Sequence, residues 1–384
     1  MSTYKSKRTE EQIKERKKEI QIAMENITPQ MMLDFFEQRI IGQHKELKMI
    51  VYMLYKYLQM ASEDVITDVP SWLLTAPSGC GKTEVYRTLK AFCAKKRIPV
   101  PVVHVDLSQI TEAGFQGKEA NTIIHSLALE DSVLDGIGIC FLDEADKKFA
   151  PSHNSVGEDS NAKAQSNLLT VIEGTIENIP LNSGGAKQFD SNQTMFVLMG
   201  AFQDLRNSKQ KRIQTTDRGI GFICRDVQTS TEDVFYEDIT LEDMIEFGML
   251  EEIAGRMQMV VNLHKLSRED MRDLILSKIH ILEQELNIPI EFDDNTINSL
   301  LDISYSNLGV RRVTNCLRTL AVRAISEVFY DKAIDSNCCL VIKNTGSAYI
   351  KFEGENHKDS GVIDNGDYTI IREEKPYENK IRVV

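Results

Sequence analysis

The stretch Ala76-Pro77-Ser78-Gly79-Cys80-Gly81-Lys82-Thr83 decides the fold of this chain. It follows an apolar, strand-like run at 72–74 and precedes a helical pattern at 84–94. A glycine-rich turn between a strand and a helix exposes backbone N–H groups that can surround phosphate oxygens. Lys82 would reach the outer phosphates, and the Thr83 hydroxyl would ligate Mg²⁺. The stretch therefore predicts a phosphate-binding loop in an α/β core, although the usual first glycine of such loops is replaced by alanine.

A second motif, Ile139-Cys140-Phe141-Leu142-Asp143-Glu144, is an apolar strand that ends in two carboxylates. Asp143 would hold the Mg²⁺ ion, and Glu144 would polarise an attacking water molecule. Each motif alone has a plainer interpretation, because a Gly/Ser/Lys turn is often a solvated loop and Asp-Glu often begins a helix. The order and separation of the two motifs predict ATP hydrolysis.

Composition limits the possible functions. The 384 residues suffice for two or three domains with cores of their own. A formal charge of −13 argues against a grip on duplex DNA, and no apolar stretch reaches the ~18 residues that a membrane span requires. The seven cysteines lack C-x-x-C spacing, which indicates reduced thiols. We expect a cytoplasmic enzyme that acts on neither nucleic acid nor a membrane.

Periodicity predicts four strands that alternate with helices, at 71–76, 100–106, 138–142 and 194–200. Such alternation implies a parallel sheet with nucleotide at the carboxyl ends of the strands. We divide the chain into a charged N-terminal arm, a large α/β ATPase domain, a smaller mostly helical domain and a C-terminal tail, at 1–27, 28–265, 266–345 and 346–384. The small domain is expected to hold helices and one short strand, at 268–283, 294–304, 309–330 and 338–343.

Three further segments are less regular. We expect residues 5–25 of the arm to be a solvated helix or disordered, because charged residues dominate them. The polar stretches 150–162 and 180–191 predict long loops of the kind that is usually functional.

Beyond the two nucleotide motifs, the chain resembles the AAA+ unfoldases of the Clp/Hsp100 class over roughly residues 28–345. The resemblance is carried by Ile40-Ile41-Gly42-Gln43, Thr111-Glu112-Ala113-Gly114-Phe115-Gln116-Gly117, Val171-Ile172-Glu173-Gly174-Thr175, Gly200-Ala201-Phe202, Glu242-Asp243-Met244-Ile245-Glu246-Phe247-Gly248 and Glu251-Glu252-Ile253-Ala254-Gly255-Arg256. It implies a ring, usually a homo-hexamer, in which ATP hydrolysis pulls an unfolded polypeptide through an axial pore.

The resemblance assigns residues to the nucleotide site. Ile40 and Ile41 match an adenine pocket in which apolar side chains sandwich the base; a buried core pair is the alternative. Arg256 matches an arginine finger that reaches the γ-phosphate of the neighbouring subunit. Its alternative is a surface ion pair with Glu251 or Glu252.

Arg311 matches the second sensor, an arginine of the helical domain that contacts phosphate in its own subunit. Arg312 is the competing candidate, but the spacing from Gly309 favours Arg311. The strand at 195–199 offers no obvious polar side chain to orient the attacking water, so no residue is assigned to the first sensor.

Two more stretches match surfaces that contact other proteins in this class. Gly114-Phe115-Gln116-Gly117 matches a pore loop whose aromatic ring pushes on the substrate; the alternative is a buried phenylalanine in a turn. Ile220-Gly221-Phe222 matches a docking tripeptide that enters an apolar cleft on a partner, here a ClpP-like peptidase. Its alternative is a short buried strand.

The sequence also departs from the class. A charged arm stands where a zinc-binding domain is expected. The substrate-selecting loop near 184–188 keeps only Lys187 as a cation, and the second pore loop, within 151–163, carries Glu158 and Asp159. A less cationic entrance should attract acidic tags less strongly.

We therefore predict an ATP-driven unfoldase that feeds unfolded or tagged proteins to a ClpP-like peptidase. One alternative is a remodelling chaperone that works without a protease. A DNA-acting AAA+ loader is the other, and the pore-loop aromatic and the −13 charge disfavour it.

Overall fold

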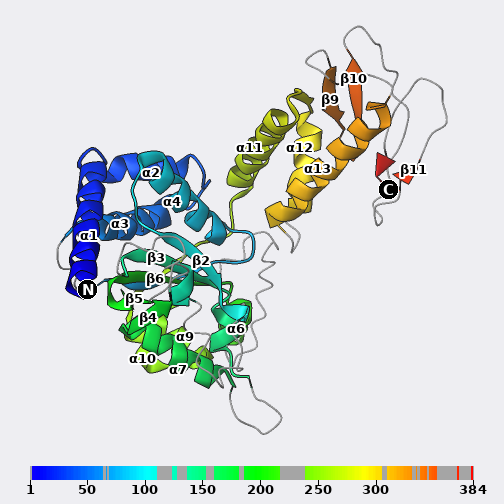
Figure 1. Cartoon of the computed structure of the whole chain (residues 1–384). Coiled ribbons are helices and arrows are strands. Elements are labelled where there is room, and N and C mark those ends of the chain that lie inside the picture. The colour runs from blue at the N-terminus through cyan, green and yellow to red at the C-terminus, as the bar shows by residue number, and fades with distance from the viewer. Residues whose placement is uncertain are drawn as a thin grey trace. The chain divides into compact units, whose positions relative to one another are not determined.

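A computed structural model of the chain describes residues 2–63, 66, 69–109, 123–127, 136–152, 160–180, 186–216, 238–304, 309–330, 334, 338–343, 346–352, 370–371 and 382–383. The chain divides into two compact units, Met1–Lys265 and Leu266–Val384 (Figure 1). Among the described residues, no helix combines the length and the apolar character needed to cross a membrane.

A five-stranded parallel sheet forms the centre of the first unit. Its strands, in spatial order, are β2 (Val102–Asp106), β3 (Gly138–Asp143), β6 (Thr194–Gly200), β1 (Ser71–Thr75) and β7 (Met257–Asn262). The four predicted strands are confirmed, and β7 is a fifth that was not predicted. Because all five strands run in one direction, their carboxyl ends lie along one edge. The phosphate loop follows β1, which lies between β6 and β7, at that edge.

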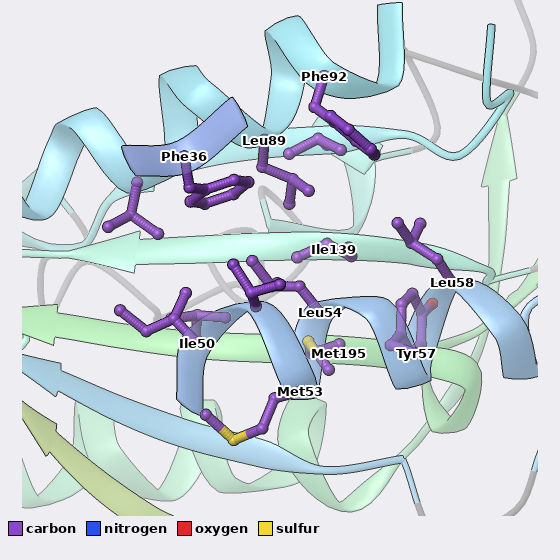
Figure 2. Close-up of a cluster of buried hydrophobic side chains, with 14 of the residues drawn as sticks. Phe36, Ile50, Met53, Leu54, Tyr57, Leu58, Leu89, Phe92, Ile139 and Met195 are labelled. Atoms are coloured by element: carbon purple, nitrogen blue, oxygen red, sulfur yellow. The ribbon is translucent and has the colours of Figure 1, made fainter. Parts of the chain in front are cut away.

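One face of the sheet is covered by helices α1 (Ser2–Glu25), α2 (Pro29–Glu37), α3 (His44–Met60) and α4 (Lys82–Lys96). Figure 2 shows side chains from α2, α3 and α4 directed toward Ile139 and Met195 of the strands. Tyr57 of α3 is fully buried there, and its hydroxyl accepts a hydrogen bond from the backbone N–H of Gly138 at 2.7 Å. This apolar layer fixes α4, and therefore the phosphate loop, against the sheet.

Helix α1 confirms the helical alternative predicted for residues 5–25, but one face of the helix is buried instead of solvated. Ile20 is fully buried and Met24 is 8% exposed, and both belong to the core under α3. They lie four residues apart, which places them on one face of the helix. The charged side chains from Glu10 to Glu25 are exposed or half-buried.

The opposite face of the sheet is covered by shorter elements: 3₁₀ turn η1 (Leu107–Gln109) and helices α6 (Asp146–Phe149), α7 (Ser160–Glu173), α8 (Gln203–Thr216), α9 (Leu241–Phe247) and α10 (Glu251–Ala254). Strand residues alternate between the two layers, as period-two geometry requires. Ile139 and Phe141, for example, face the first core, whereas Cys140 and Leu142 face the second.

The stretch 180–191, predicted as a loop, is partly a β-hairpin. Strands β4 (Ile176–Pro180) and β5 (Ala186–Asp190) pair in antiparallel register and lead through the 3₁₀ turn η2 (Ser191–Gln193) into β6. The Ser191 hydroxyl donates to the carbonyl of Val171 at 3.0 Å and thereby ties the hairpin to α7. The other predicted loop, 150–162, ends in helix, because α7 already begins at Ser160; residues 153–159 lie outside the described part.

In its described residues, the second unit has three helices and a small sheet. Helices α11 (Arg268–Leu286), α12 (Asp294–Ser304) and α13 (Gly309–Val328) confirm the predicted helices. Strand β9 (Cys338–Ile342) confirms the predicted strand and lies between β10 (Ala348–Phe352) and β8 (Ile290–Glu291). A separate two-stranded pair consists of β11 (Ile370–Ile371) and β12 (Arg382–Val383).

Candidate functional site

The phosphate loop has the backbone conformation that its glycines allow. Gly79 and Gly81 have φ angles of 82° and 99°, in the left-handed region that favours glycine. Ala76 is fully buried and is not among the described non-glycine residues with positive φ, so its methyl group causes no backbone strain at the loop entry. The substitution of the usual first glycine is therefore compatible with the fold.

Lys82 is the first residue of α4, and its Nζ donates to the carbonyl of Ala76 at 2.8 Å across the loop. Burial lowers the pKa of this lysine, and the charge of the nearby Asp143 carboxylate opposes that effect. The pKa of Lys82 is lowered overall. This contact keeps the ammonium group at the loop, where the N-terminus of α4 favours an anion.

Asp143 and Glu144 end β3 beside the phosphate loop. Glu144 has φ of 60°, a left-handed conformation that is uncommon for a non-glycine residue and clusters at active sites. Its backbone N–H donates to Oδ1 of Asp143 at 2.9 Å. Its own carboxylate is 43% exposed and pairs with Lys147 at 3.0 Å, so a water molecule can reach it.

The oxygen donors here fit a magnesium ion. Burial raises the pKa of Asp143, but hydrogen bonds from His104 and from the Glu144 backbone, together with the charge of Lys82, bring it below its ordinary value. The carboxylate is therefore ionised at neutral pH. A carboxylate with a nearby hydroxyl from Thr83 is the kind of sparse oxygen set with which Mg²⁺ binds nucleotides.

Two polar residues at this edge were missed at the level of sequence. His104 of β2 lies 3.0 Å from Asp143, measured from Nε2 to Oδ2. Asp146 accepts a hydrogen bond from the backbone N–H of Phe202 at 3.3 Å through Oδ2, whereas its Oδ1 is buried without a hydrogen-bonding partner. The signal for His104 was a polar side chain inside the valine-rich run 102–105.

A buried arginine near the loop was also missed. Arg206 of α8 is 2% exposed and donates from Nη2 to Oγ1 of Thr75 at 2.7 Å. The Thr75 hydroxyl donates to Oδ1 of Asn262 at 2.7 Å, and Asn262 makes two hydrogen bonds to the backbone of Ile239. Arg206 of α8 thus meets Thr75 and Asn262, the last residues of β1 and β7, at the carboxyl edge of the sheet. They lie beside β6, where no first sensor was assigned.

The two isoleucines predicted to contact adenine precede α3. Ile40 is 4% exposed and lies against the phosphate loop, since a methyl group added to Gly81 would meet its Cγ2 at 3.8 Å. Ile41 is half-buried. The following Gln43 has φ of 64°, and its amide makes two hydrogen bonds, of 2.6 and 3.0 Å, with the backbone of His264. Ile40 therefore lies beside the loop and is also part of the core.

The two predicted arginines lie in different units. Arg256 pairs with Glu173 at 2.8 Å, not with Glu251 or Glu252, and its side chain is 53% exposed. It is therefore on the surface of the first unit. Arg311 lies in the first turn of α13 in the second unit.

Several predicted positions lie outside the described residues. These are the pore-loop residues Gly114, Phe115, Gln116 and Gly117, the docking residues Ile220, Gly221 and Phe222, and the acidic pair Glu158 and Asp159. In the region predicted to select substrates, residues 186–188 belong to β5.

Comparison with known proteins agrees with this geometry. The family model described as "AAA domain (Cdc48 subfamily)" matches residues 67–260, which span four strands of the parallel sheet and the first four residues of the fifth, β7. The protein named ATP-dependent Clp protease ATP-binding subunit ClpX from Treponema denticola is 29% identical over 325 residues, covering 78% of this chain and 77% of its own length. Proteins of the same name from Borrelia duttonii and Borrelia recurrentis are each 28% identical over 333 residues, covering 80% of this chain and 76% of their own. The chain belongs to the AAA family, and it is a ClpX-like AAA+ protein.

Proposed function

We propose that this protein is an ATP-dependent protein unfoldase that threads polypeptides through a hexameric ring into a ClpP-like peptidase. The observation that carries the proposal is the meeting of Lys82, Asp143 and Glu144 at the carboxyl edge of a parallel AAA sheet. The names of the similar proteins support a Clp-type ATPase subunit with a protease partner.

The residues of this edge divide the work of hydrolysis. The backbone N–H groups of 78–83 and the Lys82 ammonium bind the phosphates of ATP, and Thr83 and Asp143 hold the metal. Mg²⁺, when bound with ATP, neutralises charge on the outer phosphates. Glu144 orients a water molecule for attack and accepts its proton, which the exposure of its carboxylate allows.

Residues from elsewhere complete the site in this proposal. Arg256 is exposed, as a group that acts on a neighbouring subunit must be. Ile40 and Ile41 hold the base, and Arg311 acts as the second sensor of the bound phosphates. A finger supplied in trans makes hydrolysis depend on the ring, so each ATP turnover can move one subunit against the next.

Phe115 and Phe222 carry the mechanical and docking steps in the proposal, and both assignments rest on the sequence motifs. The aromatic ring at 115, flanked by glycines, grips any polypeptide by van der Waals contact. The tripeptide 220–222 anchors the peptidase through apolar side chains.

The test is degradation of a stable protein with an unstructured tag, in the presence of ATP and a ClpP-type peptidase. We expect ATP-dependent proteolysis by the native chain, its loss in Phe222→Ala, and unchanged ATPase activity in that variant. Phe292→Ala, which changes a phenylalanine that is 38% exposed in the second unit, serves as the matched control.

Two outcomes would contradict parts of the proposal. ATP hydrolysis without proteolysis in either form would indicate a remodelling motor that needs no peptidase. The absence of ATP hydrolysis would overturn the proposal as a whole.

A further inference from the structure

His104 lies on the side of the sheet that carries the phosphate helix. In β2, Val102 belongs to the core under α4, whereas Val103 and Val105 belong to the opposite core. Strand alternation therefore directs His104 toward α4. In β3, Phe141 faces the same side, and Asp143 follows it by two residues. His104 is the register partner of Phe141 on the neighbouring strand. Its ring therefore reaches the carboxylate of Asp143, the next residue of β3 on the same face.

Besides its contact with Asp143, the imidazole ring of His104 packs against an aromatic ring of α4. The Tyr86 ring of α4 lies 5.2 Å from it, centroid to centroid, and also contacts Phe141 edge-on at 5.7 Å. Tyr86 is three residues after Thr83, on the same helix. His104 and Asp143 are 27% and 16% exposed, respectively, so the contact between them is mostly protected from water.

The chemistry of Asp143 fixes the direction of this hydrogen bond. An ionised carboxylate can only accept, so Nε2 of His104 carries the proton and donates to Oδ2 at 3.0 Å. The other oxygen, Oδ1, accepts from the Glu144 backbone at 2.9 Å. One hydrogen bond on each oxygen prevents rotation of the carboxylate and leaves further lone pairs for a metal ion.

We propose that His104 is a positioning residue, which orients Asp143 for the metal ion that accompanies the nucleotide. This inference rests on the proposed function, because it concerns the same site. Outer groups that hydrogen-bond a metal-binding side chain typically change metal affinity 10–100-fold when they are removed. A packing role alone would instead affect the protein with and without metal equally.

The test compares His104→Met, which has no donor, with His104→Gln, which keeps an N–H donor near the position of Nε2. Affinity for a fluorescent ATP analogue is measured with a chelator and then across a series of free Mg²⁺ concentrations. We expect metal-free affinity to be equal in all forms. The Mg²⁺ concentration for half-maximal effect should rise about 10–100-fold in His104→Met, and His104→Gln should restore most of the loss.

His125→Met supplies the control for the substitution, because residues 123, 124 and 127 around it pack on the other face of the sheet. An unchanged Mg²⁺ response in His104→Met would overturn the inference and leave the proposed function intact. If His104→Met lost the same nucleotide affinity with and without Mg²⁺, and His104→Gln did not restore it, His104 would have only a packing role. Nucleotide binding by the native protein that ignores Mg²⁺ would overturn both.

Discussion

Arg206 donates a hydrogen bond of 2.7 Å from Nη2 to Oγ1 of Thr75, although both side chains are almost completely buried. Thr75 ends β1, directly before the phosphate loop. Its hydroxyl in turn donates a hydrogen bond of 2.7 Å to Oδ1 of Asn262. A buried guanidinium is thereby tied to the strand that positions the loop. Since a buried donor without a partner is costly, the threonine hydroxyl should matter more than its size suggests.

Thr75→Val tests this relationship. The substitution keeps the shape of the side chain but removes the acceptor for Arg206 and the donor to Asn262. We expect a loss of about 1–3 kcal/mol in the free energy of unfolding, which corresponds to roughly 2–4 °C in melting temperature per kcal/mol for a unit of this size. Thermal and urea unfolding measure it.

Thr170→Val is the matched control for that experiment. The Thr170 hydroxyl bonds only to the carbonyl of Ser166, at 3.1 Å, on an exposed turn of α7. Its removal should change stability by no more than about 0.5 kcal/mol. Equal effects of the two substitutions would show that the Arg206 contact contributes nothing specific.

Much of the fold was predictable because its signals are local. The strand runs that precede the phosphate loop and Asp143 are apolar and short, and helices separate them. The hairpin β4–β5 was missed because its polar residues resemble a loop, and only the pairing of Ile176 with Asp190 and their neighbours makes them strands. The buried face of helix α1 was missed because its abundant charges hid the four-residue spacing of Ile20 and Met24.

The residues of the candidate site were predictable only where they lie close together in the sequence, within one motif. Lys82 and Thr83 follow their glycines, and Asp143 and Glu144 are adjacent. The contact of His104 with Asp143 joins residues 39 positions apart, and that of Arg206 with Thr75 joins residues 131 apart. The strand order brings these pairs together, and a single sequence does not reveal which strands are neighbours.

Glu144→Gln should separate binding from hydrolysis. The amide keeps the size of the side chain but cannot accept a proton from water, so we expect ATP turnover to fall about 10²–10⁴-fold. Nucleotide affinity should stay close to native, because the ion pair with Lys147 that is lost lies on the surface. Phosphate release and equilibrium binding give the two quantities.

Glu19→Gln controls for the loss of a negative charge, since Glu19 is 53% exposed on α1 and also pairs with a neighbouring cation, Arg16. Turnover near the native rate in Glu144→Gln would remove Glu144 from the chemistry and require another base.

Asp146→Asn should stabilise the protein at neutral pH. Burial, followed by the charge of Glu144, raises the pKa of Asp146 above its ordinary value of 3.8 in the folded state. A group of this kind stabilises the fold below its unfolded pKa, and the contribution is lost as pH rises through the folded pKa. The ionised carboxylate, with Oδ1 buried and unpartnered, is therefore unfavourable at pH 7.

We expect the melting temperature of Asp146→Asn to exceed that of the native chain by roughly 1–4 °C at pH 7–8, where about 1 kcal/mol shifts it by 2–4 °C. The difference should shrink as pH falls through the raised pKa of Asp146, because protonation removes the charge that is unfavourable in the folded state. Asp34→Asn, at an exposed position of α2, should show no such trend. A difference that grows toward low pH would contradict the assigned direction.

Arg256 provides the sharpest test of an oligomeric site, because its two possible roles predict different behaviour in mixtures. As half of a surface ion pair with Glu173, it contributes about 0–1 kcal/mol, so Arg256→Ala should keep its melting temperature. As an arginine finger, its loss should lower turnover about 10³–10⁵-fold. Arg268→Ala is the control, since Arg268 is 54% exposed and pairs with Asp302.

Mixing Arg256→Ala with Glu144→Gln decides in which subunit the arginine acts. Each variant alone should be nearly inactive. In a mixed ring, a subunit that carries Arg256→Ala keeps an intact Glu144, and a neighbour that carries Glu144→Gln supplies the missing arginine. Hydrolysis should therefore reappear on mixing if Arg256 reaches the next subunit. If Arg256 acted within its own subunit, no pairing could assemble a complete site, and the mixture would stay as inactive as its components.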